Sequence, residues 1–333
     1  MKRLRLYGLL AAGMVLATCP ATLLSARPAQ KAASPAKVEP ARKPRNVVFI
    51  LLDDLRYDGM GFLQPELRTP NIDRLARGGT YFPNTVVTSS LCSPSRATIL
   101  TGETARNHGI VDNANSSEAG LTFFPSYLQK AGYQTAFIGK WHMGNDVDTP
   151  RPGFDKWVSF RGQGSYYPAS GDPDAAVQGG ETTMWNVDGK KVAQQGYITD
   201  ELTDYAMNWL EKERDKSKPF FLSVWTHEPH LPIESDPRFM AHYPDADAGT
   251  KQHHGNVTQI DHAFSKLMKT LDELKLTEDT LVIFTSDNGP EGNGKRGRTR
   301  GSTGGLRGRK RAMYEGGIRV PGIIRWPGRV EKG

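Results

Sequence analysis

The sequence predicts an α/β fold in which a central, mostly parallel but mixed β-sheet is flanked by helices. Short apolar segments of strand length alternate along the chain with longer segments of helical character. Each apolar segment also runs directly into ionisable or polar residues. Because ligands collect at the carboxyl ends of the strands in such sheets, we expect these residues to share one site.

The four expected strands are almost continuously apolar and rich in β-branched residues, as strands buried on both faces are. They cover Asn46–Leu52, residues 135–138, Phe220–Trp225 and residues 280–285. Expected helices lie between them at residues 71–77, 124–131, 200–212 and 257–274. Residues 143–195 are rich in Gly, Pro and aromatic residues, and we expect them to form long loops over the site.

The start of the chain has the pattern of an export signal. Three basic residues precede an apolar run at residues 6–17, and small residues follow. We expect residues 1–26 to be a secretory signal peptide, too short for a stable transmembrane segment, and residues 27–45 to be a disordered linker. We expect residues 46–333 to form one domain of a periplasmic or secreted protein. The residue before Cys19 is a threonine, which is unusual for a lipoprotein signal, so we expect no lipid anchor.

The net charge of the 333-residue chain is +7, but it comes from the N-terminal segment. Residues 1–45 hold nine of the 43 basic residues and one of the 36 acidic residues, so residues 46–333 hold 34 basic and 35 acidic residues. A nearly neutral domain of this kind does not support nucleic-acid binding. With 37% hydrophobic residues, it is long enough to bury a large core.

Cys92 has no partner for an intrachain disulfide, because Cys19 falls in the expected signal peptide. A lone cysteine is most often a structural residue of the core. A thiolate nucleophile of the tyrosine-phosphatase kind is a second interpretation. That motif needs five residues between its cysteine and its arginine, whereas three separate Cys92 from Arg96.

The residues after Cys92 predict a helix start. Ser93 is the expected N-cap, Pro94 is the expected first helical residue, and Gly102 is the expected end. The free N–H groups of such a terminus, together with Arg96, favour an anion beside Cys92.

Oxygen ligands follow two of the expected strands. Asp53 and Asp54 end the first strand, and Asp287 and Asn288 end the last. Three converging carboxylates would repel one another without a cation. Together with the amide they form a site suited to Ca²⁺ or Mg²⁺. Taken singly, each pair would more often be a turn or a helix cap.

Cationic and imidazole side chains follow the other strands or lie near the expected site. They are Arg96, Lys140, His142, His227 and Lys310, with His230 as a neighbour. Fixed cations of this kind stabilise the negative charge that spreads over the oxygens of a transferring anionic group.

Three stretches together resemble the type I, formylglycine-dependent sulfatases, an arylsulfatase-like family of the alkaline phosphatase superfamily. The first is Cys-x-Pro-Ser-Arg at residues 92–96, followed by Ile-Leu-Thr-Gly at residues 99–102. The second is Gly-Tyr-Gln-Thr-Ala-Phe-Ile-Gly-Lys-Trp-His at residues 132–142, and the third is Lys-x-x-x-Tyr-Glu-Gly-Gly at residues 310–317. The resemblance covers residues 46 to about 328 in family order. It implies an alkaline-phosphatase-like sandwich.

The resemblance also implies a role for each site residue. Cys92 would be converted to formylglycine by a maturation enzyme and would face a divalent cation, usually Ca²⁺. The implied cation ligands are Asp53, Asp54, Cys92, Asp287 and Asn288. The implied catalytic residues are Cys92, Arg96, Lys140, His142, His227 and Lys310, and His230 would contact the substrate.

The implied reaction is hydrolysis of a sulfuric ester. One hydroxyl of the hydrated aldehyde attacks sulfur, with Asp287 as the expected base. The alcohol leaves with a proton from His227 or Lys310, and the second hydroxyl then expels sulfate. A phosphodiester or phosphonate ester hydrolase of the same superfamily is the alternative, and a non-catalytic carbohydrate-binding relative is a third hypothesis.

Two features near the C-terminal end complete the expectations. Residues 295–311 hold eight basic residues and no acidic one, which is typical of a solvated loop or of a guide for a sulfated polysaccharide. Sulfatases usually continue into a smaller C-terminal domain, so the resemblance implies that this domain is missing and that the chain is a fragment.

Overall fold

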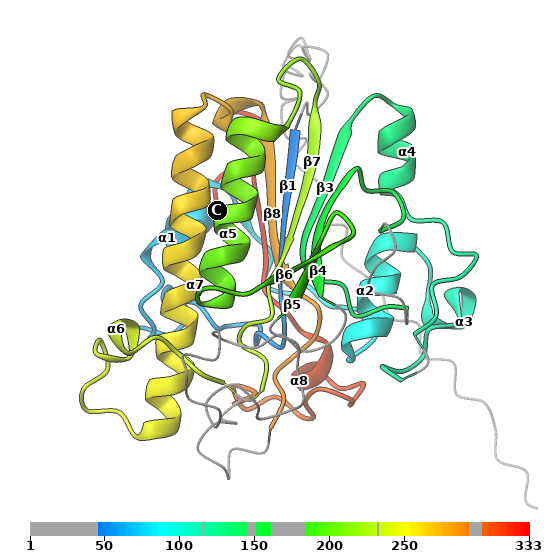
Figure 1. Cartoon of the computed structure of the whole chain (residues 1–333). Coiled ribbons are helices and arrows are strands. Elements are labelled where there is room, and N and C mark those ends of the chain that lie inside the picture. The colour runs from blue at the N-terminus through cyan, green and yellow to red at the C-terminus, as the bar shows by residue number, and fades with distance from the viewer. Residues whose placement is uncertain (1–45, 115, 145–150, 161–183, 232, 293–301) are drawn as a thin grey trace, which may run out of the picture. The chain divides into compact units, whose positions relative to one another are not determined.

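The sheet is built outward from β1 (Asn46–Leu52), which pairs in parallel with β8 (Thr280–Ser286) on one side and β7 (Phe220–Trp225) on the other. β3 (Gln134–Lys140) and β4 (Lys156–Phe160) continue the parallel part beyond β7. The four expected strands are therefore confirmed as neighbours, and their carboxyl ends meet at one edge of the sheet (Figure 1).

The computed structural model describes residues 46–114, 116–144, 151–160, 184–231, 233–292 and 302–333. The expected signal peptide at residues 1–26, the linker at residues 27–45 and part of the basic segment at residues 295–311 lie outside the described residues. Among the helices of the described ranges, none combines the length and the apolar character that a bilayer crossing requires.

Antiparallel strands extend both edges of the sheet and make it mixed. The strand order in the described structure is β2-β9-β8-β1-β7-β3-β4-β5-β6. On one side, β9 (Gly322–Arg325) pairs antiparallel with β8 and with β2 (Thr80–Tyr81). On the other side, β5 (Met184–Val187) pairs antiparallel with β4 and with β6 (Lys190–Ala193).

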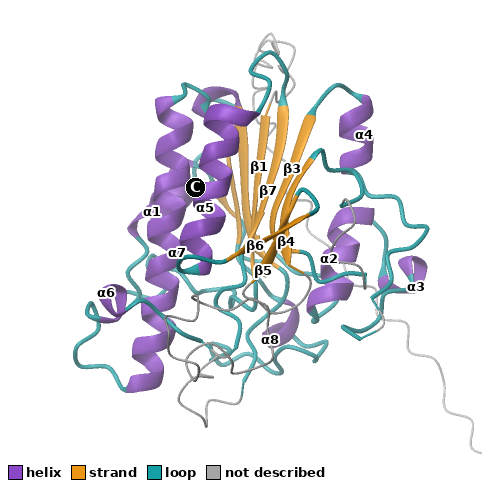
Figure 2. Cartoon of the chain, in the orientation of Figure 1, coloured by secondary structure: helices purple, strands orange, loops and turns teal. Residues whose placement is uncertain are grey.

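Helices cover both faces of the sheet (Figure 2). The α-helices are α1 (Pro70–Gly78), α2 (Cys92–Thr101), α3 (Ala105–His108), α4 (Pro125–Lys130), α5 (Ile198–Asn208), α6 (Pro237–Met240), α7 (Ala248–Glu273) and α8 (Glu315–Ile318). α5 continues as a π-helical turn, Trp209–Glu213, and a short 3₁₀ turn, Thr277–Asp279, precedes β8.

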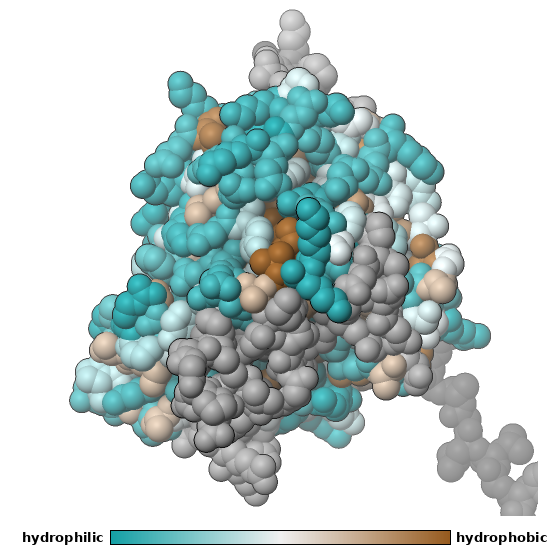
Figure 3. All heavy atoms as spheres, in the orientation of Figure 1, coloured by the Kyte–Doolittle hydropathy of each residue, from teal (hydrophilic) through white to brown (hydrophobic). Residues whose placement is uncertain are grey.

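Side-chain alternation along β1 creates two hydrophobic cores, one on each face of the sheet. Val48 and Ile50 belong to the core under α1, α5 and α7, whereas Phe49 and Leu51 belong to the core that includes α2 residues and Trp141. The outer faces of α5 and α7 are predominantly hydrophilic, as expected for helices with one buried face (Figure 3). The described part of the sheet is thus packed against hydrophobic side chains on both faces.

The interpretation of residues 143–195 as loops is wrong in part, because β4, β5 and β6 lie within it. These strands have only four or five residues each, and β6, at the edge of the sheet, is exposed along its whole length. Residues 145–150 and 161–183 lie outside the described residues. The fourth expected helix also begins earlier than predicted, at Ala248, where Asp247 accepts hydrogen bonds from Gly249 and Thr250 as its N-cap.

A residue from a distant helix caps α1. Thr69, the local N-cap residue, makes no side-chain capping bond, and Asp261 of α7 instead accepts hydrogen bonds from Asn71 N at 3.0 Å and Ile72 N at 2.7 Å. Burial raises the pKa of Asp261 to about 6, although these hydrogen bonds oppose the shift. Asp261 therefore joins α1 to α7 at the cost of a desolvated carboxylate.

We expect Asp261→Ala to lower the free energy of unfolding by roughly 1–3 kcal/mol, because two buried N–H groups lose their acceptor. Asp261→Asn, which keeps one acceptor oxygen, should lose less. The pKa of Asp261 in the folded state lies above the usual value of about 3.9. The stability that Asp261 gives the folded state is therefore complete below about pH 3.9 and is lost as pH rises through 6. Thermal unfolding of both variants at pH 5 and pH 7 tests this, and an Asn variant equally affected at both pH values would contradict it.

Candidate active site

The carboxyl ends of four parallel strands deliver the predicted site residues to one place. Asp53 and Asp54 follow β1, Lys140 is the last residue of β3, and His227 follows β7. Asp287 follows β8 in the same way. All five are buried, so the sheet edge supplies a desolvated cluster of charged and polar groups.

Backbone hydrogen bonds hold the loops after β1, β7 and β8 together. Asp53 N donates to the carbonyl of Glu228 at 3.1 Å, and Asp287 N donates to the carbonyl of Leu52 at 3.0 Å. Asp54 lies in the left-handed region with φ 65°, which aspartate tolerates better than most residues, and its N–H donates to Asp287 Oδ1 at 3.2 Å. The carboxylates of the two strand ends therefore face each other across β1 and β8.

Arg96 joins α2 to the strand ends. Its Nε and Nη2 donate to Asp287 Oδ2 at 2.9 and 2.7 Å, and Nη2 also lies 3.4 Å from Asp53 Oδ2. Nη1 donates to the carbonyl of Lys140 at 2.7 Å, and the Lys140 ammonium pairs with Asp53. These charges are fully buried, so each stabilises the others at short range and low dielectric.

Lys310 completes the cluster from the far end of the chain. Its Nζ lies 2.9 and 3.0 Å from the two carboxylate oxygens of Asp54, 2.8 Å from His230 Nε2 and 3.1 Å from Glu291 Oε2. Close backbone packing positions this segment: Gly289 N donates to the Gly317 carbonyl at 2.8 Å. A Cβ atom at position 289 would lie 2.2 Å from the carbonyl oxygen of Gly316, so this close approach requires glycine.

Cys92 lies inside the cluster, with its Sγ 3.4 Å from Asp53 Oδ1. The expectation that Ser93 is the N-cap is wrong, because α2 begins at Cys92 and Leu91 is its cap residue, without a side-chain capping bond. Ser93 Oγ instead donates to the carbonyl of His142 at 2.5 Å, and Ser93 N donates to Asn113 Oδ1 at 3.0 Å. The helix end at Gly102 is confirmed, with φ 73° in the left-handed region.

Three histidines line the same cluster and are neutral in it. Burial and the nearby Lys140 lower the pKa of His142 well below its usual range and that of His227 to about 3. Burial and Lys310 lower the pKa of His230 well below its usual value. The rings of His227 and His230 are neighbours, with centroids 5.2 Å apart, and His230 Nδ1 contacts the Leu231 carbonyl at 2.6 Å.

The acidic groups and the thiol respond differently to burial. Burial would raise the pKa of Asp53, but Lys140, His230 and Arg96 lower it well below the usual value. Burial raises the pKa of Asp54 to about 7, with Lys310 opposing the shift, and burial together with Asp53 raises that of Asp287. Burial and Asp53 also raise the pKa of the Cys92 thiol, which keeps it from ionising.

The donor set fits a divalent cation. Asp53, Asp54, Cys92 and His230 each offer a ligand atom, and these atoms lie within 4.8 Å of one another. Asn288 adds a second sign: its Nδ2 donates to Asp54 Oδ1 at 2.6 Å, whereas its buried Oδ1 has no hydrogen-bond donor among the described residues. Such an acceptor is stabilised by a cation. His230, expected to contact substrate, thus also lies within reach of the candidate cation position.

Two residues that contact the site, Glu291 and Asn113, are not among those that the sequence predicts. Glu291 contacts Lys310 directly, and its position three residues after Asn288 is the signal that could have found it. Asn113 binds the N-terminal turn of α2, and nothing in the local sequence marks it, because its partner is 20 residues away.

The sequence model of the Sulfatase family matches residues 45–332, and the chain belongs to this family. It is 39% identical over 233 residues to N-acetylglucosamine-6-O-sulfatase of Bacteroides thetaiotaomicron, covering 68% of this chain and 38% of that protein. It is 32% identical over 314 residues to human arylsulfatase A, covering 87% of this chain and 61% of that protein.

Solved structures confirm the alkaline-phosphatase-like fold of the sulfatases. The crystal structure of Ps i-CgsB in complex with k-i-k-neocarrahexaose has a TM-score of 0.77 and 32% identity, covering 88% of this chain and 68% of that one. Phosphonate monoester hydrolase of Agrobacterium radiobacter has a TM-score of 0.59 and 19% identity, which shows a shared fold only.

We expect Asp54→Asn to weaken binding of a divalent cation severely, and Asp54→Ala to weaken it at least as much, because each removes one of the clustered carboxylates. Asp188→Asn is the matched control, since Asp188 also has a positive φ but lies outside the cluster, where it pairs with Lys156. Elemental analysis after dialysis against Ca²⁺ or Mg²⁺ gives the occupancy. Full cation occupancy in Asp54→Ala would show that Asp54 is not a ligand of the cation.

Proposed function

We propose that this chain is the catalytic part of a sulfuric ester hydrolase that removes sulfate from a carbohydrate or aryl sulfate ester. The observation that carries the proposal is one buried cluster in which Cys92 of the family motif, three cationic side chains and three carboxylates meet. The names of the relatives, which include an N-acetylglucosamine-6-O-sulfatase, favour a sulfated glycan as substrate.

The nucleophile that we propose derives from Cys92. The family motif predicts its conversion to formylglycine, and the hydrated aldehyde would supply the attacking oxygen. Position 92 suits this role because its side chain touches Asp53 and lies at the N-terminal end of α2. Asp287 would hold Arg96 in place and accept a proton, since its carboxylate lies in the same buried cluster as Cys92.

Arg96, Lys140 and Lys310 would bind the transferring sulfuryl group. Each is held by a buried carboxylate, so their charges are fixed before substrate arrives and cost little reorganisation. His142 would assist renewal of the aldehyde, which is supported by its neutral ring and by the absence of a hydrogen-bond partner on Nδ1 among the described residues.

Asp53, Asp54, Asp287 and Asn288, with position 92, would hold the divalent cation, for which we propose Ca²⁺. These oxygen donors suit a hard cation, and Mg²⁺ is the alternative. When bound, the cation would lower the pKa of the attacking hydroxyl group and offset the charge of the carboxylates.

Lys310 and His227 are the two candidates for protonating the leaving alcohol. Although burial opposes it, Asp54 and neighbouring acidic groups raise the pKa of Lys310 well above its usual value, so the ammonium carries a proton at neutral pH. His227 is neutral there. We therefore propose Lys310 as the proton donor and His227 as a hydrogen-bond donor to the sulfate.

A phosphodiester or phosphonate ester hydrolase remains the second candidate function, because such enzymes share the fold. Rates on paired aryl sulfate and aryl phosphate diester substrates separate the two. Higher kcat/KM on the phosphate diester would overturn the proposal.

Export and maturation complete the proposed function. The basic and apolar pattern of residues 1–26 supports export to the periplasm or the medium. A formylglycine-generating enzyme would act on Cys92 during maturation, since the residues Pro94 and Arg96 that such an enzyme reads are present.

We predict that Cys92 is found as formylglycine when the chain is made in cells with the maturation machinery. Mass spectrometry of the tryptic peptide ending at Arg96 should show the aldehyde in place of the thiol. Cys92→Ala should abolish turnover, while the circular dichroism spectrum of the folded chain stays unchanged. Full activity of material with wholly unmodified Cys92 would rule the mechanism out.

The proton donor can be identified from a series of sulfate esters whose leaving alcohols differ in pKa. We expect Lys310→Ala to lose more activity as the alcohol becomes more basic, because poor leaving groups depend most on protonation. His227→Ala should lose activity nearly equally across the series. A steeper dependence in His227→Ala than in Lys310→Ala would assign the proton to His227 instead.

A further inference from the structure

We propose that Glu291, Arg311 and Met313 form the surface that binds the leaving group of the ester, and that they recognise it as a sugar unit through hydroxyls next to the scissile sulfate. This inference rests on the proposed function and specifies its substrate. None of the three residues has a role in the mechanism above.

Glu291 stands at the mouth of the buried cluster. Of the three side chains that contact the Lys310 ammonium, Asp54 and His230 are only 2% and 6% exposed, whereas Glu291 is 21% exposed. A group bound to sulfate at Lys310 and extending toward solvent therefore passes the Glu291 carboxylate. This carboxylate still has free lone pairs after binding Lys310 and Arg311.

Arg311 pairs with Glu291 and is held in place by its backbone. The guanidinium contacts Glu291 Oε1, yet 59% of the Arg311 side chain is exposed. Its backbone is in the left-handed region with φ 75°, which is rare for a residue other than glycine. Arg311 N donates to the carbonyl of Ser90 at 2.7 Å, and the preceding Lys310 N donates to that of Pro290 at 3.1 Å.

These two bonds anchor residues 310–311 to the loops that carry the reacting groups. Ser90 lies two residues before Cys92, and Pro290 lies two residues after Asn288. A strained conformation kept by its surroundings is often found at a ligand-binding site. The position of Arg311 is therefore fixed relative to Cys92 and to the candidate cation site.

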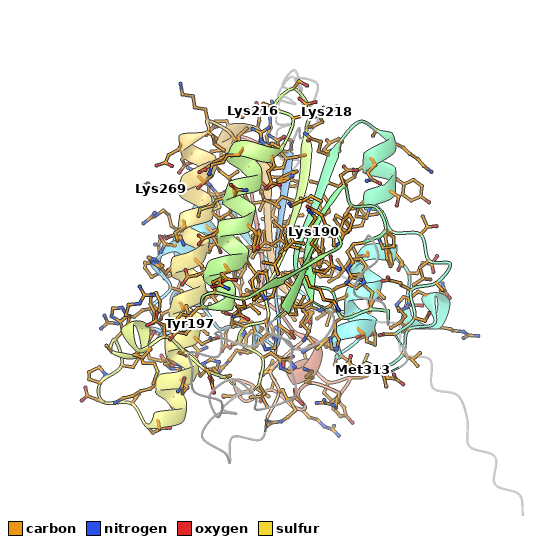
Figure 4. All side chains as sticks on the ribbon, viewed as in Figure 1. Lys190, Tyr197, Lys216, Lys218, Lys269 and Met313 are labelled. Atoms are coloured by element: carbon orange, nitrogen blue, oxygen red, sulfur yellow. The ribbon has the colours of Figure 1, made fainter. Side chains whose placement is uncertain are left out.

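Met313 adds an apolar contact beside the charged pair. It is 63% exposed, and its Sδ lies 3.7 Å from Ser90 Oγ. Figure 4 shows Met313 at the end of the molecule where α8 and the carboxyl ends of the strands lie, opposite to Lys216 and Lys218. An exposed methionine is a flexible apolar surface suited to the C–H face of a sugar ring.

The chemistry of the three residues matches a polyol better than an anion. A carboxylate accepts hydrogen bonds from hydroxyl groups, and a guanidinium donates to ring and hydroxyl oxygens. A second sulfate has no proton to donate to the Glu291 carboxylate, so a carboxylate at this position favours a hydroxyl group over a sulfate. We therefore infer a sugar with free hydroxyls beside the scissile ester.

Binding can be measured without turnover in a Cys92→Ala chain by isothermal titration with N-acetylglucosamine 6-sulfate and with inorganic sulfate. We expect Arg311→Ala to raise the Kd of the sugar sulfate by about tenfold more than that of inorganic sulfate, the effect of losing a charged hydrogen bond. Glu291→Gln should weaken the sugar sulfate but tighten inorganic sulfate, because it removes an acceptor and a repelling charge together.

Lys218→Ala is the matched control, since Lys218 is 56% exposed, pairs with Asp215 and lies at the opposite end of the sheet. It should change neither Kd. Equal changes for both ligands in Arg311→Ala or Glu291→Gln, or a Cys92→Ala chain that binds the sugar sulfate no tighter than inorganic sulfate, would overturn the proposal. Failure of the proposed function is seen separately, as no hydrolysis of any sulfate ester by the mature protein.

Discussion

The balance of buried charge at the carboxyl edge of the sheet is the constraint on which the rest of the structure depends. Asp53, Asp54 and Asp287 face three cationic partners, Lys140, Lys310 and Arg96, and nearly all of this charge is removed from water. Breaking one such buried pair costs roughly 3–5 kcal/mol, because the remaining charge is left uncompensated. The cluster is therefore stable only when segments from all parts of the chain are assembled at once.

Contacts between distant segments fix the N-terminal ends of α1 and α2. Asp261 of α7 caps α1, and Asn113 binds the first turn of α2. Local capping residues such as Thr69 and Leu91 make no side-chain capping bonds. The orientation of α2, and with it the position of Cys92, thus follows from tertiary structure, which is consistent with a site that requires accurate placement.

The site separates two kinds of titratable group by their surroundings. Lys310 keeps its proton because carboxylates surround it, and the buried imidazoles of His142 and His227 remain neutral near Lys140. Fixed cations and neutral imidazoles in one buried cluster suit an anionic group that needs positive charge on one side and proton exchange on another. Glu291 and Arg311 then extend the same charge pattern outward to the mouth.

The sequence by itself determined the four central strands, the class of fold and the residues that meet at the sheet edge. Continuous apolar runs that end in ionisable residues are local signals, and the sulfatase motifs are short enough to read directly. Only the tertiary structure decided that α2 begins at Cys92, that three strands lie within residues 143–195, and that Glu291 and Asn113 join the site. The physical reason is that these features depend on partners distant in sequence, whereas propensity and periodicity describe only neighbours along the chain.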